Sequence, residues 1–123
     1  LPLIVDVLSA HEGHWFAIQQ PEVHLHPRAQ AALGGLVHQL VAERGLSFVV
    51  ETHSDFLIDR FRLELSRTEW SAADDAAQVL FFERTDQGNQ VHVIPIDGKG
   101  RFGEQPESFR AFFIREALSL LEV

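Results

Sequence analysis

Residues 15–27 read WFAIQQPEVHLHP, and this stretch decides the fold prediction. Its first four residues are apolar and lie between Gly13 and Pro21, a run that is too short for a helix and predicts a β-strand. Two glutamines, Gln19 and Gln20, follow the apolar run and lead into a polar segment that ends at Pro27. The stretch therefore predicts a strand that ends in a polar loop, a place where binding and catalytic groups are often found.

Helical patterns lie on both sides of this stretch. Residues 2–11 are typical of the end of a helix. After the stretch, apolar residues recur at helical spacing from residue 29 to residue 41, and the Arg-Gly pair at 44–45 is typical of a helix end. The Gly-Gly pair at 34–35 weakens that helix, so we expect another segment to pack closely against it.

A second strand and helix follow in the same order. Residues 47–51 read SFVVE, which predicts a strand of the kind that is buried on both faces of a parallel sheet. Ser54 is a favourable N-cap for a helix over residues 55–66. The order helix, strand, helix, strand, helix is typical of a parallel α/β unit.

The second half of the chain has a different pattern. Residues 78–84 and 90–96 flank the sequence TDQGN, which predicts a β-hairpin with a five-residue loop. Residues 97–106 contain three glycines and predict a loop. A last helix is expected from about Glu107, with a buried face formed by Phe109, Phe112, Phe113, Ala117, Leu120 and Leu121. The predicted fold class is therefore α/β, with parallel strands and flanking helices followed by a hairpin and a helix.

The composition limits the classes of protein to consider. The 123 residues, 46% hydrophobic and 23% charged, fit a single globular domain over 1–123. No apolar run approaches the roughly 20 residues of a membrane span, so no membrane partner is expected. The net charge of −8 lacks the basic character of a self-sufficient nucleic-acid binder, and the absence of cysteine agrees with a cytoplasmic location. The chain has no methionine and begins at Leu1 within an apolar pattern, so we expect it to be part of a longer protein.

Two polar segments follow the two predicted strands. Residues 19–26 leave the end of the first strand, and residues 51–55 leave the end of the second. In open parallel sheets, ligands bind beyond the carboxyl ends of the strands, where the loops converge and helix N-termini favour anions. We therefore expect the two segments to form one site.

The residues of both segments carry a resemblance to a known group of enzymes. The sequence FAIQQPEVHLHPRAQ, residues 16–30, resembles the Walker B strand and D-loop of ABC-type ATPases of the RecF/SMC/OLD-like group, which are AAA-type P-loop NTPases. The sequence FVVETHSDFLIDR, residues 48–60, resembles the strand, switch-histidine loop and helix of the same group. The resemblance covers residues 1–66 and implies a partial P-loop NTPase lobe. Residues 67–123, with the hairpin, the glycine-rich loop and the terminal helix, resemble the C-terminal extension of such ATPases only loosely.

The resemblance implies a role for individual residues. Gln19 stands where the group has the acid that holds Mg²⁺ through water, and Gln20 stands where it has the glutamate that polarises the attacking water. His53 matches the switch histidine that reaches the γ-phosphate, with Ser54 beside it among the cofactor-binding residues. The D-loop residues that cross to a partner protomer would be Glu22, His24 and His26. Glu22 is also the nearest acid that could substitute for the missing Walker B glutamate in catalysis.

The departures from the group concern the phosphate loop and the two acids. No G-x-x-x-x-G-K-[ST] motif is present, and Gly98-Lys99-Gly100 lacks its spacing. We therefore expect no cofactor on this fragment alone and no ATPase activity. ATP and Mg²⁺ would bind in a full-length parent that adds the N-terminal half of the head and forms a head-to-head homodimer. Because glutamine cannot act as a base, we expect slow hydrolysis. Work on nucleic acid in DNA repair, or on an effector protein in phage defence, would involve other regions of the parent.

Two other classes of function remain open. If residues 22–26 were extended, Glu22, His24 and His26 would share one face and hold a metal ion, with His53 or Asp55 completing the site of a metal-dependent hydrolase or nuclease. Alternatively, the hairpin and the Phe-rich helix form a non-catalytic interaction module. The plainest alternatives are that the two glutamines only bind loop backbone and that His53 is a core histidine.

Overall fold

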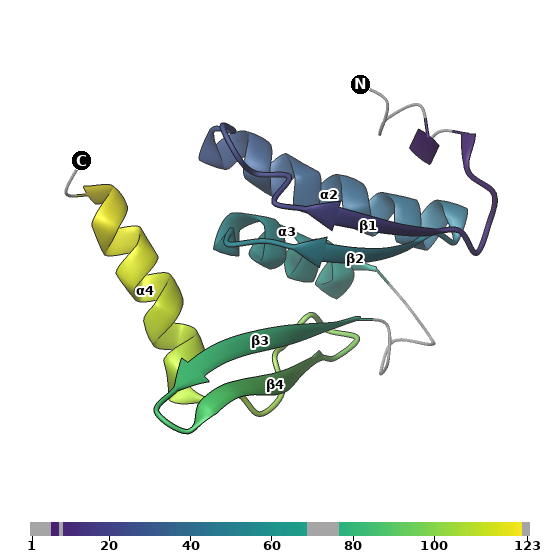
Figure 1. Ribbon diagram of the computed structural model, residues 1–123. Coiled ribbons are helices and arrows are strands. Elements are labelled where there is room, and N and C mark those ends of the chain that lie inside the picture. The colour runs from purple at the N-terminus through teal and green to yellow at the C-terminus, as the bar shows by residue number, and fades with distance from the viewer. Residues whose placement is uncertain (1–5, 8, 69–76, 122–123) are drawn as a thin grey trace. The chain divides into compact units, whose positions relative to one another are not determined.

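The computed structural model describes residues 6–7, 9–68 and 77–121 (Figure 1). The chain forms two compact units, Leu1–Glu64 and Leu65–Val123. The elements follow the order β1 (Trp15–Gln19), α2 (Pro27–Arg44), β2 (Ser47–Glu51), α3 (Asp55–Arg67), β3 (Ala77–Thr85), β4 (Gly88–Ile96) and α4 (Glu107–Leu121). The fold class is α/β, with a parallel pair of strands, helices and an antiparallel hairpin, as the sequence predicts. Of the helix predicted over residues 2–11, only Asp6, Val7 and Ser9 are described as helical.

The first unit contains the parallel pair β1–β2, in which Trp15 lies opposite Ser47 and Gln19 opposite Glu51. Figure 1 shows α2 and α3 running beside these strands. Phe16 and Phe48 stack with ring centroids 5.6 Å apart and pack against the core of Val7, Leu40 and Leu46. The other face of the sheet is open, because Trp15 is 69% and Val49 60% exposed. The prediction that the second strand is buried on both faces is therefore wrong for this chain, since the helices cover only one face.

The two helices of the first unit begin and end at the residues that the sequence indicates. Gly45 takes the left-handed conformation with φ 62°, and its N–H caps α2 by donating to the carbonyl groups of Leu40 and Val41. Ser54 caps α3, because its Oγ accepts a hydrogen bond from the Leu57 N–H at 3.1 Å. The two helices also approach closely at Gly34, where an added Cβ would lie 2.1 Å from the Leu57 carbonyl oxygen. The predicted close packing at the Gly-Gly pair is confirmed.

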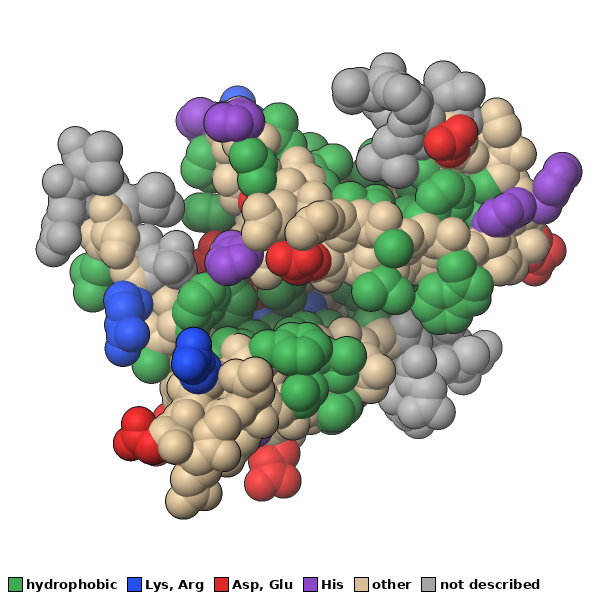
Figure 2. Space-filling view, viewed as in Figure 1, with side chains coloured by type: hydrophobic (Ala, Val, Ile, Leu, Met, Phe, Trp, Pro, Cys, Tyr) green, Lys and Arg blue, Asp and Glu red, His purple; other side chains and the backbone are tan. Residues whose placement is uncertain are grey.

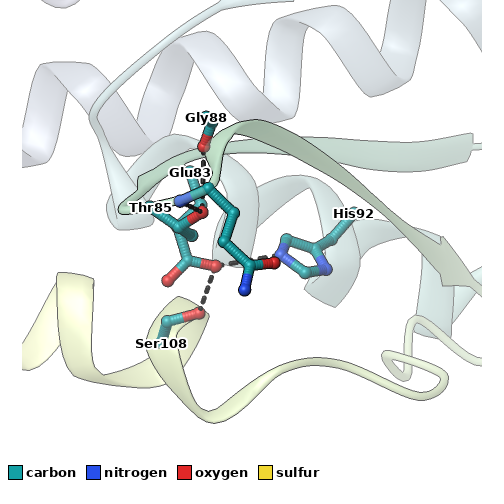
Figure 3. Close-up of polar contacts among 6 residues, drawn as sticks. Glu83, Thr85, Gly88, His92 and Ser108 are labelled. Carbon is teal, nitrogen blue, oxygen red and sulfur yellow. Dashed lines mark hydrogen bonds and ion pairs between the residues drawn. The ribbon is translucent and has the colours of Figure 1, made fainter.

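The second unit is built on the antiparallel hairpin β3–β4, whose strands are longer and whose turn is shorter than predicted. Thr85 pairs with Gly88, so the turn consists of Asp86 and Gln87 alone instead of five residues. Thr85 Oγ1 accepts the Gln87 N–H and donates to the Gly88 carbonyl group at 2.9 Å, and Gly88 has φ 109° (Figure 3). The threonine hydroxyl and the glycine therefore allow the ladder to continue into the segment that the sequence indicated as loop.

A partly buried polar contact joins α4 to both strands of the hairpin. Glu83 Oε2 lies 2.9 Å from His92 Nε2 and accepts a hydrogen bond from Ser108 Oγ at 3.1 Å (Figure 3). Beside it, Phe81 meets Phe109 edge to face, with ring centroids 5.3 Å apart. The order of groups places the carboxylate between the serine and the histidine, so the three side chains do not form a serine–histidine–acid relay. They hold the first turn of α4 on the hairpin.

The buried face predicted for α4 extends less far along the helix than expected. Phe109 is buried and contacts Phe102 and Phe113, whereas Leu121 is 82% exposed. Figure 1 shows the last turns of α4 running past the hairpin, which explains why Leu121 is not covered. The side chains of Ala117 and Leu120 lie outside the described set. Within the described residues, no helix is long and apolar enough to cross a membrane.

The glycine-rich segment after β4 is a turn that Asp97 closes. Its Oδ1 accepts hydrogen bonds from the N–H groups of Lys99 and Arg101, both at 2.9 Å, and its Oδ2 pairs with Arg101 Nε at 2.9 Å. The Arg101 carbonyl group in turn accepts the Asp97 N–H. These contacts lower the pKa of the Asp97 carboxyl group below its ordinary value, mainly through the backbone hydrogen bond from Arg101.

Candidate functional site

The two predicted polar segments meet at one edge of the parallel sheet. Gln19 and Glu51 are the last residues of β1 and β2 and lie opposite each other in the register. Past the sheet, the Gln20 N–H donates to the Glu51 carbonyl group at 2.7 Å, and the Gln20 side-chain amide donates to Glu51 Oε1 at 3.3 Å. The segment that follows β1, residues 20–26, is called the first loop below, and residues 52–54 after β2 are called the second loop. The edge therefore carries two amides and one carboxylate at its centre.

The first loop is a tight turn, which contradicts the extended conformation that the metal hypothesis assumes. Gln20 and His24 have φ 45° and 66°, a region that residues other than glycine rarely adopt. The Leu25 N–H donates to the Glu22 carbonyl group at 2.9 Å, which closes the turn. Because the backbone bends here, Glu22, His24 and His26 do not alternate on a common face.

The histidines of the first loop lie at the surface and do not gather around an ion. His24 and His26 are both exposed, and His26 caps α2, because its Nδ1 accepts the Arg28 N–H at 3.3 Å. Within the part of the chain that the structure describes, no three His, Cys, Asp or Glu side chains are grouped as a metal site. The proposed set of Glu22, His24 and His26 is therefore not assembled in this structure.

Glu22 joins the first loop to the second. Its side chain is 9% exposed, and Oε1 accepts two hydrogen bonds, from Thr52 Oγ1 at 2.8 Å and from the His53 backbone N–H at 2.7 Å. Its Oε2 is buried and accepts no hydrogen bond from the described residues. A charged acceptor makes hydrogen bonds about twice as strong as a neutral one, so Glu22 fixes the backbone of the second loop.

Further hydrogen bonds close a ring between the two loops and the helix starts. Thr52 Oγ1 accepts the Ser54 N–H at 3.0 Å, and Ser54 Oγ donates to Gln30 Oε1 at 2.6 Å. The Gln30 side-chain amide then donates to the Leu25 carbonyl group at 3.0 Å. Because Leu25 belongs to the first loop, this hydrogen bond completes the ring. Ser54 is 4% exposed, and its hydroxyl donates to Gln30 and accepts the Leu57 N–H of the α3 cap, so in the described structure it holds the second loop.

The remaining predicted site residues differ in exposure. The side chains of Gln19 and His53 are exposed, and Gln20 is partly buried. His53 is thus not a core histidine, while the amide of Gln20 is held by a side chain as well as by backbone. Asp55, the first residue of α3, has its carboxyl pKa raised above the ordinary value, chiefly by burial and also by the charge of Asp59.

Sequence reasoning gave no individual role to three residues of the site, although two of them, Glu51 and Thr52, lie in the predicted polar segment 51–55. Glu51 ends the second strand, as predicted, and brings a carboxylate to the sheet edge opposite Gln19. Thr52 and Gln30 complete the hydrogen-bond ring, and no spacing in the sequence links a residue of the first turn of α2 to the second loop. The only signal for Glu51 was an acid at the end of an apolar run, SFVVE.

The first half of the chain is similar to a known family. Residues 1–59 match an AAA domain family. Its description is AAA domain, putative AbiEii toxin, Type IV TA system. No curated protein and no solved structure is significantly similar to the chain. The match contains β1, α2, β2 and both loops of the site, and it supports an AAA-type, P-loop ATPase domain in this part of the chain.

Proposed function

We propose that this chain is the C-terminal part of an ABC-type ATPase head of the RecF/SMC/OLD-like group. The observation that carries the proposal is the meeting of the first and second loops at one sheet edge, where Glu22 binds the backbone of His53. The order and separation of the two motifs and the family match over residues 1–59 support it. ATP would bind beyond the ends of β1 and β2, where open parallel sheets take their ligands.

The phosphate loop of this head would come from the N-terminal half of the same protein. The 123 residues contain no G-x-x-x-x-G-K-[ST] motif, so the chain lacks the backbone cradle for the phosphates. Two such heads would meet face to face around ATP. His24 and His26, which are exposed on the first loop, are available to face the partner head.

The residues at the sheet edge fit a magnesium ion. Mg²⁺ prefers oxygen ligands and keeps several waters, and Gln19 and Glu51 bring an exposed amide and an exposed carboxylate to adjacent positions. These two side chains would hold the ion through its waters. Bound Mg²⁺ supplies positive charge that offsets the charge on the phosphates.

The chain's own groups would act on the water and on the γ-phosphate. Gln20 can orient the attacking water through its amide, although it cannot remove a proton. His53 would donate a hydrogen bond to the γ-phosphate from the exposed end of the second loop. Glu22 would not reach the water while its Oε1 binds Thr52 and His53. Because Gln20 cannot remove a proton and Glu22 is held by the second loop, hydrolysis would be slow.

The ATP cycle would then drive work through other parts of the protein. We place it in the cytoplasm, in DNA repair or in phage defence, with nucleic acid or an effector protein as the partner of those parts. The experiment compares ATP binding and turnover by this chain and by the full-length protein. We expect neither with the chain alone, and Mg²⁺-dependent binding with slow turnover in the full-length protein. Turnover by the chain alone, or no binding by the full-length protein, contradicts the proposal.

The hairpin supports an interaction module as a second candidate. One of its faces is apolar and exposed, with Leu80 opposite Val93 and Phe82 opposite Val91; Phe82 is 70% and Val93 58% exposed. Figure 2 shows hydrophobic side chains, in green, reaching the surface of the protein. A paired apolar face of this kind often marks a contact surface. Sedimentation analysis of F82D tests this role: unchanged association of the variant would exclude the hairpin face.

A further inference from the structure

We propose that Glu22 is a positioning residue that sets the place of the switch histidine, His53, by holding the backbone of the second loop. This inference rests on the proposed function for the role of His53. The hydrogen bonds between Glu22 and the second loop do not depend on that function. A base role would need the carboxylate to reach a water, whereas here Oε1 is committed to the Thr52 hydroxyl and the His53 N–H at 2.8 and 2.7 Å.

The position of Glu22 makes it the link between the two loops. It belongs to the turn that follows β1, and both of its donors belong to the segment that follows β2. Its side chain is 9% exposed, so bulk water competes little for these hydrogen bonds. A shift of the first loop is therefore passed directly to the backbone at His53.

The other hydrogen bonds of the ring restrain the second loop, to which Glu22 is bound. Thr52 also receives the Ser54 N–H, and Ser54 also binds Gln30 at the start of α2. Ser54 is the N-cap of α3 as well, so the second loop is held at both of its ends. His53 is exposed, on a backbone that hydrogen bonds from its neighbours hold in place. This arrangement suits a residue that must meet a phosphate at one place.

The choice of an acid at this position is costly for folding. Oε2 is buried and accepts no hydrogen bond from the described residues. A buried polar atom without a partner lowers stability, and such atoms in native proteins call for a functional explanation. A carboxylate is the strongest acceptor available for the His53 N–H, which accounts for its presence in a positioning role.

The first test measures amide hydrogen exchange by NMR on the 123-residue chain and its E22A and E22Q variants. Removing the acceptor in E22A should speed exchange at the His53 amide about tenfold or more, since a hydrogen bond to a charged group is lost. E22Q keeps one oxygen and should restore most of the protection. The control is the Ser47 amide, which donates to the His14 carbonyl group at 2.9 Å at the other end of β2. Equal His53 exchange in wild type and E22A overturns the proposal.

A second pair of variants covers the case in which E22A unfolds the unit, which loss of protection at Ser47 would reveal. T52V removes the hydroxyl that serves both Glu22 and the Ser54 N–H, while T52S keeps it. Exchange at Ser54 should rise several-fold in T52V and stay near the wild-type rate in T52S. No difference between the two variants contradicts the hydrogen-bond ring and with it the proposal.

A kinetic test in the full-length protein separates positioning from base catalysis. If Glu22 positions His53, E22A should lower kcat by about tenfold, E22Q should lose several-fold less, and E22A should add little to H53A. Equal losses in E22A and E22Q would instead assign Glu22 as a base and overturn the positioning role. Absence of ATPase activity in the wild-type protein would refute the proposed function alone, because the exchange results would still report the link to His53.

Discussion

Gln20 donates its side-chain amide to Glu51 across the ends of the two parallel strands, at 3.3 Å. Gln20, which we propose stands in the place of the Walker B glutamate, is therefore held by an acid from the neighbouring strand. Gln19 lies opposite the same acid in the register. Glu51 thus provides one carboxylate at a sheet edge where the resemblance implies two acids.

This arrangement predicts that Glu51 supplies charge that the two glutamines lack. If the full-length protein is the proposed ATPase, E51Q should lower its Mg²⁺-dependent turnover by about tenfold and raise the Mg²⁺ concentration needed for half-maximal rate, because the Glu51 carboxylate at the edge is lost. The matched control is E43Q, which changes an exposed acid on α2.

The double variant Q20E/E51Q moves the carboxylate from the end of β2 to the start of the first loop. We expect it to recover at least part of the activity lost in E51Q, as measured by steady-state turnover against Mg²⁺ concentration. If E51Q has wild-type kinetics at every Mg²⁺ concentration, Glu51 has no part in the proposed magnesium site.

Gly34 and Gly35 predict opposite stability changes for the same substitution. G34A places a Cβ 2.1 Å from the Leu57 carbonyl oxygen, so the two helices must separate; we expect a loss of roughly 1–3 kcal/mol in the free energy of unfolding. G35A meets only the Arg60 side chain at 3.8 Å and should gain up to about 1 kcal/mol from helix propensity. Urea unfolding followed by circular dichroism measures both. A G34A variant as stable as G35A would refute the close approach of α2 and α3.

Asp97 predicts a stability contribution that disappears in acid. Its folded-state pKa lies below the ordinary value of 3.8, so the folded state favours the charged carboxylate. The contribution is fully present at pH above 3.8 and is lost as the pH falls through the lower folded-state pKa. D97N should therefore be less stable than wild type at pH 6, and the difference should shrink in the most acidic buffers. A difference that grows on acidification would contradict the assigned sign.

Much of the fold could be predicted because it depends on local patterns. Helical spacing, the Arg-Gly end of α2 and the Ser54 cap indicated α2 and α3 nearly to the residue. The turn of the hairpin was predicted too long, because the decisive contact is a side-chain hydrogen bond of Thr85 to Gly88 that composition does not reveal. The open face at Val49 was missed because burial depends on which segments cover a strand, and a strand's own sequence does not state this.

The candidate site could be predicted in part, because its position follows from the order of the two strands. The order of two strands implied that their loops converge, and they do. The direction of the Glu22 side chain could not be predicted, because it follows from a turn in which Gln20 and His24 adopt positive φ values. Whether Gln19, Gln20 and His53 act on nucleotide stays a prediction, as does the extent of the domain over 1–123.

The central claim is that the second loop presents a switch histidine to ATP, and the most direct measurement is the ATPase rate of the full-length protein with H53A. The control is H11A, which removes another exposed histidine of the first unit. The account predicts that kcat falls by about tenfold or more in H53A, as expected when a contact to the γ-phosphate is lost, and stays unchanged in H11A. An H53A enzyme with the kcat and KM of the wild type would contradict it.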